Sequence, residues 1–163
     1  VSSRMMLDIE LERGGEIIYR DKALNDVVLH GYGDCIRLTA WCAGDRITSF
    51  SGDGIILSTP TGSTGYSMSA GGPIVEPEAS AIIVSPICAH MMRARSYVLS
   101  ASHDVAVLAE KLHRRRAGIS VEGNSVMDLT NGDLLRVRRS ERCILMADMG
   151  LKSFFDLAFE KLT

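Results

Sequence analysis

Residues 52–74 read GDGIILSTPTGSTGYSMSAGGPI, and their composition differs from the rest of the chain. The apolar run at residues 55–57 favours a buried strand, because β-branched side chains pack well on a pleated sheet. After Pro60 the stretch becomes dense in glycine and hydroxyl side chains. Residues 52–86 hold six of the fifteen glycines and all four prolines, which are turn-forming residues. The pattern predicts a strand followed by a polar, irregular loop.

Short apolar runs separated by turn residues lie on both sides of this stretch. Near the start, Leu7, Ile9 and Leu11 fall on one face of an extended run, and Gly14-Gly15-Glu16 is typical of a turn. Residues 106–116 suit either a strand or a helix by composition. Further strands are expected at residues 17–19, 27–31, 37–41, 47–50, 79–85, 97–100, 104–108, 118–121 and 134–138. The body is therefore predicted to be mostly β.

The last segment has a helical period instead. Its apolar side chains recur at a spacing of three and four residues, namely Leu151, Phe154, Phe155, Ala158, Phe159 and Leu162. Such spacing places them in one stripe along a helix. The opposite side carries Lys152, Asp156, Glu160 and Lys161. We expect one amphipathic helix over about residues 151–162.

Length and charge narrow the classes of protein. A chain of 163 residues suits one domain. Its formal net charge of −2 gives no overall attraction to nucleic acid or to anionic lipid. No apolar run approaches the roughly 18 residues of a membrane span, and charge near the start argues against a signal peptide. We therefore expect a cytoplasmic protein with no nucleic-acid or membrane partner.

The reactive side chains show no familiar metal or catalytic spacing. The four cysteines, at 35, 42, 88 and 143, form no CxxC pair, and we interpret them as buried thiols in a reducing cytosol. The four histidines are spread along the chain, so metal coordination by them is not expected. No GxxxxGK[ST], GxSxG or HExxH motif occurs.

The loop after residue 57 has the chemistry of a nucleoside site. Glycine lets the backbone approach a ligand closely, and hydroxyl side chains can bond base edges and ribose. Tyr66 offers a flat ring with a polar tip, and Asp53 a carboxylate suited to a ribose or an amide. No Lys or Arg occurs from residue 52 to residue 92, which disfavours a bare phosphate. The alternative is a glycine-rich connector in a β protein.

The order of residues adds a family resemblance. Residues 52–74 closely resemble the signature of the NAD kinase family. Residues 23–28, ALNDVV, resemble the Asn-Glu motif of that family, and residues 86–95, PICAHMMRAR, its Thr-Pro-x-x-x-His segment. Residues 120–123 and 131–133 are similar to weaker late motifs. The related lipid kinases share the fold class but lack the STPTGSTGY pattern.

The resemblance implies an NAD-binding site, carried over residue by residue. Asn25 and Asp26 match the pair that contacts the base and ribose hydroxyls, with Asp one methylene shorter than the usual Glu. Asp53 matches the residue facing the nicotinamide side. Residue chemistry alone also allows structural roles, namely a turn for Asp53, a strand cap for Asn25 and a core position for Tyr66. The matching positions are Asn25, Asp26, Asp53, Thr61, Thr64, Gly65, Tyr66 and Ser69.

The resemblance covers about residues 4–162 and implies one part of a two-domain enzyme. In the family, an N-terminal α/β domain bears a Gly-Gly-Asp-Gly motif whose Asp activates the acceptor hydroxyl and helps to place Mg-ATP. A β-sandwich-like C-terminal domain holds the dinucleotide. Residues 1–147 are expected to be that NAD-binding domain. Residues 148–163 are expected to be a helix that packs on the N-terminal domain or on a neighbouring subunit.

The implied reaction is phosphoryl transfer from ATP or polyphosphate to the 2′-hydroxyl of the adenosine ribose of NAD, which gives NADP. Mg²⁺ would arrive with ATP and would not be held by this chain alone. The family's shared sites imply a homodimer or homotetramer. The 163 residues contain no Gly-Gly-Asp-Gly motif, so the chain alone is expected to be inactive. The alternative is a non-catalytic dinucleotide-binding or regulatory module.

Overall fold

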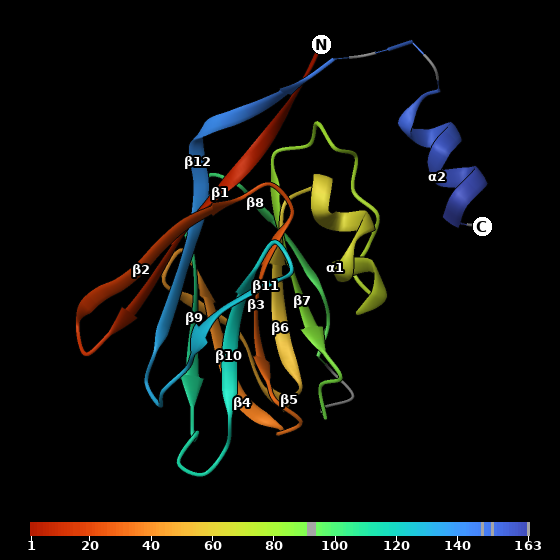
Figure 1. Cartoon of the computed structure of the whole chain (residues 1–163). Coiled ribbons are helices and arrows are strands. Elements are labelled where there is room, and N and C mark those ends of the chain that lie inside the picture. Colours follow the sequence, from red (N-terminus) through yellow and green to blue (C-terminus); the bar gives the residue numbers. More distant parts are fainter. Residues whose placement is uncertain (91–93, 148, 151, 163) are drawn as a thin grey trace.

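The computed structural model describes residues 1–90, 94–147, 149–150 and 152–162, and these form two antiparallel six-stranded sheets (Figure 1). The first sheet contains, in spatial order, β2 (Glu16–Ala23), β1 (Ser2–Arg13), β12 (Leu134–Met146), β9 (Val105–Glu110), β4 (Ile36–Cys42) and β5 (Asp45–Gly52). The second contains β11 (Asn124–Asp128), β10 (Ala117–Val121), β3 (Asp26–Gly31), β6 (Gly54–Ser58), β7 (Ala81–Ile87) and β8 (Tyr97–Ser100). The predicted mostly β, sandwich-like fold is confirmed.

Side-chain alternation explains how the sheets pack. Leu7, Ile9 and Leu11 of β1 are buried in one cluster with residues from both sheets, among them Leu29 of β3 and Leu57 of β6. Successive residues of a strand point to opposite faces, so one face of each sheet enters this shared core. Burying that apolar surface is the main force that holds the two sheets together.

The centre of the second sheet is buried on both faces. All five residues of β6 are buried, and this strand pairs with β3 on one side and β7 on the other. On the face away from the main core, Val28, Ile56 and Ile87 form a second, smaller cluster that Ala70 packs against. The segment after β6, with a 3₁₀ turn η1 (Thr61–Thr64) and helix α1 (Tyr66–Ser69), therefore covers part of the outer face.

The terminal helix α2 (Phe154–Leu162) lies apart from both sheets (Figure 1). Phe155 and Phe159 are exposed, and none of the helix residues is buried. The predicted helix is confirmed over residues 154–162, while Leu151 lies outside the described residues. No helix among the described residues is long and apolar enough to cross a membrane.

Three details differ from the sequence prediction. Residues 105–110 form β9 and the chain then leaves the sheet, so the helical alternative for residues 106–116 is wrong. β11 was not expected, because its sequence NSVMD has a weak apolar pattern. Only Cys42 is buried. Cys35 is half-buried in a loop, and Cys88 and Cys143 are exposed, because each lies where its strand leaves the core.

Candidate functional site

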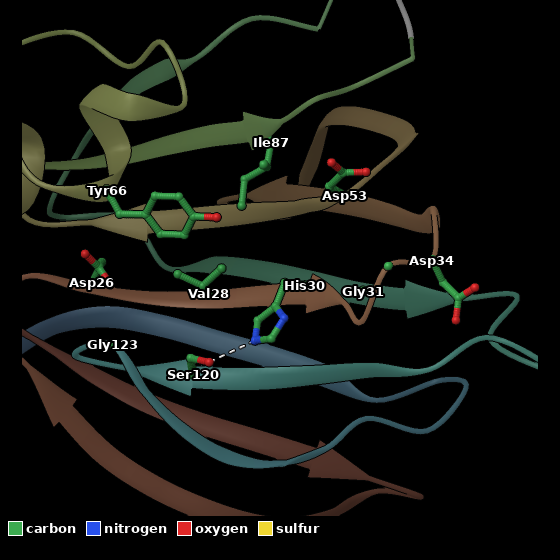
Figure 2. Close-up of a pocket in the computed structure, with 11 residues that line it drawn as sticks. Asp26, Val28, His30, Gly31, Asp34, Asp53, Tyr66, Ile87, Ser120 and Gly123 are labelled. Atoms are coloured by element: carbon green, nitrogen blue, oxygen red, sulfur yellow. Dashed lines mark hydrogen bonds between the residues drawn. The ribbon is translucent and has the colours of Figure 1, made fainter.

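A cavity of about 560 Å³ opens on the outer face of the second sheet (Figure 2). That volume lies within the usual range for small-molecule sites. β3, β6, β7 and β10 form its floor, and the segment after β6 contributes Tyr66 to its side. The wall consists of Asp26, Val28, His30, Gly31, Gly33, Asp34, Asp53, Tyr66, Ile87, Ser120 and Gly123.

The period of strand β3 sets the length of the cavity. Asp26, Val28 and His30 are two residues apart, so all three point to the same face of the sheet. At a rise of about 3.4 Å per residue, Asp26 and His30 lie about 14 Å apart along the strand. Val27 and Leu29, between them, point into the main core. The site is therefore an elongated groove with room for more than one ring of a ligand.

The polar loop after β6 is locked against the residues that precede β3. The backbone N–H of Thr59 donates to the carbonyl of Asn25 at 2.9 Å, and the Thr59 hydroxyl donates to the carbonyl of Leu24. That hydroxyl also accepts from the N–H of Gly62 at 3.1 Å. A Cβ at Gly62 would lie 2.2 Å from the carbonyl oxygen of Asn25, so only glycine allows this approach. The loop thus holds residues 24–25 in place.

Several hydroxyls of the loop serve the loop itself. The Ser63 hydroxyl donates to the carbonyl of Val75 at 3.1 Å and accepts from its N–H at 3.0 Å. The hydroxyls of Ser67 and Ser85 bond each other at 2.9 Å in the interior. Buried polar groups need such partners, because an unpaired one costs free energy. The hydroxyl density that suggested a ligand is therefore partly structural.

Asp26 is the most unusual group in the cavity. Its residue is only 7% exposed, and its carboxyl receives no hydrogen bond from any residue that the structure describes. Burial, and then the negative charge of Glu122, raise the pKa of this carboxyl. A buried polar group without a partner is costly unless a ligand supplies one. Asp26 is therefore suited to accept hydrogen bonds from ligand hydroxyls.

The other end of the groove is built around Asp53 and Asp34. The Asp53 backbone donates to the carbonyl of Ile87 at 3.0 Å and accepts from the N–H of Gly31 at 2.8 Å, which leaves its carboxyl exposed at the rim. The carboxyl of Asp34 accepts from the N–H of Arg116 at 2.7 Å. Figure 2 shows Asp34 and Asp53 far from Asp26, at the opposite end of the group.

Charge limits the ligand that this groove can take. Its wall holds three carboxyl groups and no Lys or Arg. A triphosphate would meet repulsion there, whereas hydroxyls, amides and a cationic ring would be stabilised. Val28, Ile87 and the ring of Tyr66 supply apolar surface between the two acidic ends (Figure 2).

The strands and the loop that build this groove fall within a known family model. Residues 24–148 match the model described as the ATP-NAD kinase C-terminal domain. The chain belongs to the NAD kinase family. An NAD kinase of Ruminiclostridium cellulolyticum is 33% identical over 164 residues, which is 99% of this chain and 57% of that protein. The chain thus spans little more than half the length of that relative.

Solved structures of NAD kinase relatives share the fold. The yeast NADH kinase complexed with NADH superposes with a TM-score of 0.79 at 32% identity, over 85% of this chain and 41% of that one. An NAD kinase from Archaeoglobus fulgidus in complex with ATP gives 0.68 at 27% identity, over 86% of this chain and 53% of that one. The family resemblance and the fold that it implied are both confirmed.

The structure brings together three of the residues that the NAD kinase resemblance singled out. Asp26, Asp53 and Tyr66 line one groove although up to 40 residues separate them in sequence. Tyr66 is 48% exposed, so the core position that its chemistry also allowed is wrong. Their roles in binding a ligand stay predictions.

The other predicted residues lie beside the groove and are not part of its wall. Asn25 is half-buried behind Asp26. Thr61 and Thr64 are half-buried in η1, Gly65 is exposed between η1 and α1, and Ser69 is exposed on α1. The Thr61 hydroxyl is buried without a hydrogen-bond partner among the described residues. Their part in binding stays a prediction.

Sequence reasoning missed several wall residues. His30 bonds the Ser120 hydroxyl through Nε2 at 2.8 Å and meets the ring of Tyr32 edge to face. The period of two from Asp26 would have placed His30 on the same face, so that signal was present. Asp34 and Ser120 come from other parts of the chain, and only tertiary structure brings them to the groove.

The part of the chain that the structure describes offers no metal-ligand cluster of its own. Among the described residues, no group of three or more His, Cys, Asp or Glu side chains is placed to hold one. The carboxyls at the two ends of the groove are too far apart to share an ion (Figure 2). We therefore derive no step through Mg²⁺ from this chain.

Proposed function

We propose that the protein of this chain is an NAD kinase, which transfers a phosphoryl group from ATP or polyphosphate to the 2′-hydroxyl of the adenosine ribose of NAD. In that reaction the 2′-oxygen forms a bond to the γ-phosphorus, the bond to the leaving phosphate oxygen breaks, and the hydroxyl proton passes to a base. NADP and ADP are the products when ATP is the donor.

The observation that carries the proposal is the carboxyl of Asp26, a residue only 7% exposed, which faces the groove and has no hydrogen-bond donor among the described residues. A carboxylate in this state fits a pair of ribose hydroxyls, which donate the hydrogen bonds that it lacks. The acidic far end, with Asp34 and Asp53, fits an amide and a cationic ring. Both requirements are met by NAD.

This chain would contribute binding and orientation. Phosphoryl transfer depends mostly on positioning and charge stabilisation, and fixing the acceptor hydroxyl removes much of its entropic cost. The base and the groups that hold Mg-ATP would come from a Gly-Gly-Asp-Gly motif, which these 163 residues do not contain. A cytoplasmic location and a homodimer or homotetramer, in which sites are shared, complete the proposal.

The test removes predicted hydrogen bonds to NAD in the complete gene product. Asn25→Ala and Asp53→Ala should each lower kcat/KM for NAD by an amount equivalent to about 1–3 kcal/mol, because a ligand group is left without its partner. Glu16→Ala, at the exposed first residue of β2, is the matched control and should change nothing. Unchanged kcat/KM in both site variants would contradict the site assignment.

A non-catalytic dinucleotide-binding module is the second candidate, and the missing Gly-Gly-Asp-Gly motif favours it. The coding region before Val1 separates the two candidates. A Gly-Gly-Asp-Gly motif about 60–120 residues upstream, within the size of a typical domain, supports the kinase. A start codon at Val1, together with NAD binding and no NADP formation, supports the module.

A further inference from the structure

Glu122, which lies outside the groove wall, holds Asn25 and Asp26 in place at the Asp26 end of the groove. Glu122 follows β10 and has a left-handed backbone, with φ of 52°. Because β10 pairs with β3 in the register Val121 to Val27, Glu122 lies beside the start of β3. Its neighbour Gly123 is part of the groove wall, so Glu122 stands directly behind the Asp26 end.

The side chain and backbone of Glu122 together make four hydrogen bonds to two residues. Its Oε1 accepts from the backbone N–H of Asn25 at 2.7 Å and from that of Asp26 at 3.0 Å. Its Oε2 accepts from Nδ2 of Asn25 at 3.2 Å. Its own N–H donates to the carbonyl of Asp26 at 3.1 Å. Only a carboxylate offers acceptors to three donors in this way.

These contacts decide which way the Asn25 amide faces. An ionised carboxylate accepts hydrogen bonds and donates none, so the NH₂ group of Asn25 must turn toward Glu122. The Oδ1 atom of Asn25 receives no hydrogen bond from any residue that the structure describes. It is left as an acceptor for something outside this chain.

We propose that Glu122 is a positioning residue for the nucleotide: it holds the backbone of Asn25 and Asp26 and fixes the Asn25 amide so that Oδ1 accepts a hydrogen bond from a donor group of the ligand. The role rests on the proposed function for the identity of the ligand, NAD. Glu122 itself touches residues 25 and 26, and it acts on the ligand through them.

The decisive variants exchange donors and acceptors without changing volume. Glu122→Gln places an amide nitrogen against Nδ2 of Asn25, which drives the Asn25 amide to rotate and present a donor to the ligand. Asn25→Asp keeps an acceptor toward the ligand but sets two carboxylates against each other. In the double variant, the amide N–H at position 122 donates to the carboxylate at position 25. The other oxygen of that carboxylate still offers an acceptor to the ligand.

In the complete gene product, each single variant should raise KM for NAD by about tenfold or more, with kcat nearly unchanged. The double variant should recover to within about threefold of the unsubstituted protein, which is the signature of coupled residues. Glu16→Gln, at the exposed first residue of β2, is the control and should leave KM unchanged. A Glu122→Gln variant with normal KM, or a double variant as poor as its parents, overturns the proposal.

A second measurement does not depend on turnover. In the ¹⁵N-labelled chain, the side-chain amide signals that vanish in Asn25→Asp belong to Asn25, and they should shift in Glu122→Gln. Signals that stay in place overturn the proposal. If the unsubstituted complete gene product forms no NADP, the proposed function fails. The amide signals of the 163-residue chain still decide whether Glu122 orients the Asn25 amide.

Discussion

At the scale of single residues, the charge of Asp26 should lower folding stability while it serves the proposed binding of NAD. Asp26 is buried at the start of β3, its carboxyl has no hydrogen-bond donor among the described residues, and burial together with Glu122 raises its pKa. An acid whose pKa is raised by folding is more stable in its protonated form in the folded chain than in the unfolded one. Its ionised form therefore lowers the stability of the folded chain as pH rises from the unfolded pKa through the folded one.

Replacing Asp26 by Asn should stabilise the protein and weaken NAD binding. The expected gain is about 0.5–2 kcal/mol in the free energy of unfolding at pH 7, the size typical of changes that relieve a functional site. The gain should fade below about pH 4, where the native carboxyl is protonated in both states. Denaturant unfolding at several pH values measures it, with Asp45→Asn at the exposed first residue of β5 as control. A loss of stability at pH 7 would refute this reading.

At the scale of elements, the turn between β11 and β12 is held by an ion pair between the buried Asp133 and the partly exposed Arg13. Asp133 is fully buried and accepts from Nε and Nη2 of Arg13 at 2.9 and 2.8 Å, and from the N–H and hydroxyl of Thr130. Burial alone would raise the pKa of Asp133, but the hydrogen bonds from Arg13 and Thr130 outweigh it and hold the pKa below its ordinary value. The pair joins the end of β1 to the entry of β12.

Arg13→Ala should destabilise the chain by about 1–3 kcal/mol at neutral pH, because it leaves a buried carboxylate with fewer donors. A lowered folded pKa contributes stability above the unfolded pKa and loses it as pH falls through the folded value. The difference between variant and parent should therefore shrink in acid, below about pH 4. Arg20→Ala, which breaks an exposed pair with Glu10, should cost about 0–1 kcal/mol. Equal losses for both variants in thermal unfolding would contradict the assignment.

Helix α2 exposes apolar side chains to solvent. Phe155 and Phe159 are 63% and 73% exposed. Exposed apolar patches favour association, so we expect the 163-residue chain to self-associate through this helix. Phe155→Ser together with Phe159→Ser should shift sedimentation toward the monomer, whereas Lys161→Ser on the same helix should not. A chain that is monomeric at high concentration before any substitution would contradict this expectation.

At the scale of the whole molecule, the two sheets form one shared core and the groove lies outside it. No residue of that shared core lines the groove, although the same strands carry both. The sandwich can therefore form from its own apolar faces without the groove. We propose that the base for phosphoryl transfer comes from outside these 163 residues.

The 163-residue chain should accordingly fold but form no NADP with Mg-ATP and NAD. Circular dichroism should report β structure and a cooperative unfolding transition. Adding the upstream residues of the gene, where they encode a Gly-Gly-Asp-Gly motif, should restore activity. NADP formation by the 163-residue chain at enzymatic rates would show that the missing carboxylate is not required.

Local sequence patterns determined much of the secondary structure of this protein. The alternation of Leu7, Ile9 and Leu11, the period of three and four in α2, and the glycine-rich loop each depend on neighbours in sequence, so their structures could be predicted. Family membership followed from the order of residues in that loop. The family resemblance of residues 23–28 and 52–74 singled out Asp26, Asp53 and Tyr66 as candidate site residues, and their roles stay predictions.

Tertiary structure decided what no local pattern contains. Ser120 reaches the groove, and Glu122 reaches the start of β3, because β10 pairs with β3, a contact between segments about 90 residues apart. Whether the hydroxyls of Ser63 and Ser67 face a ligand depends on which polar groups the fold brings near them. Here Ser63 bonds the backbone of Val75 and Ser67 bonds the hydroxyl of Ser85. Burial of Asp26 beside a second carboxylate is likewise a property of packing, because that carboxylate belongs to Glu122, in the turn after β10.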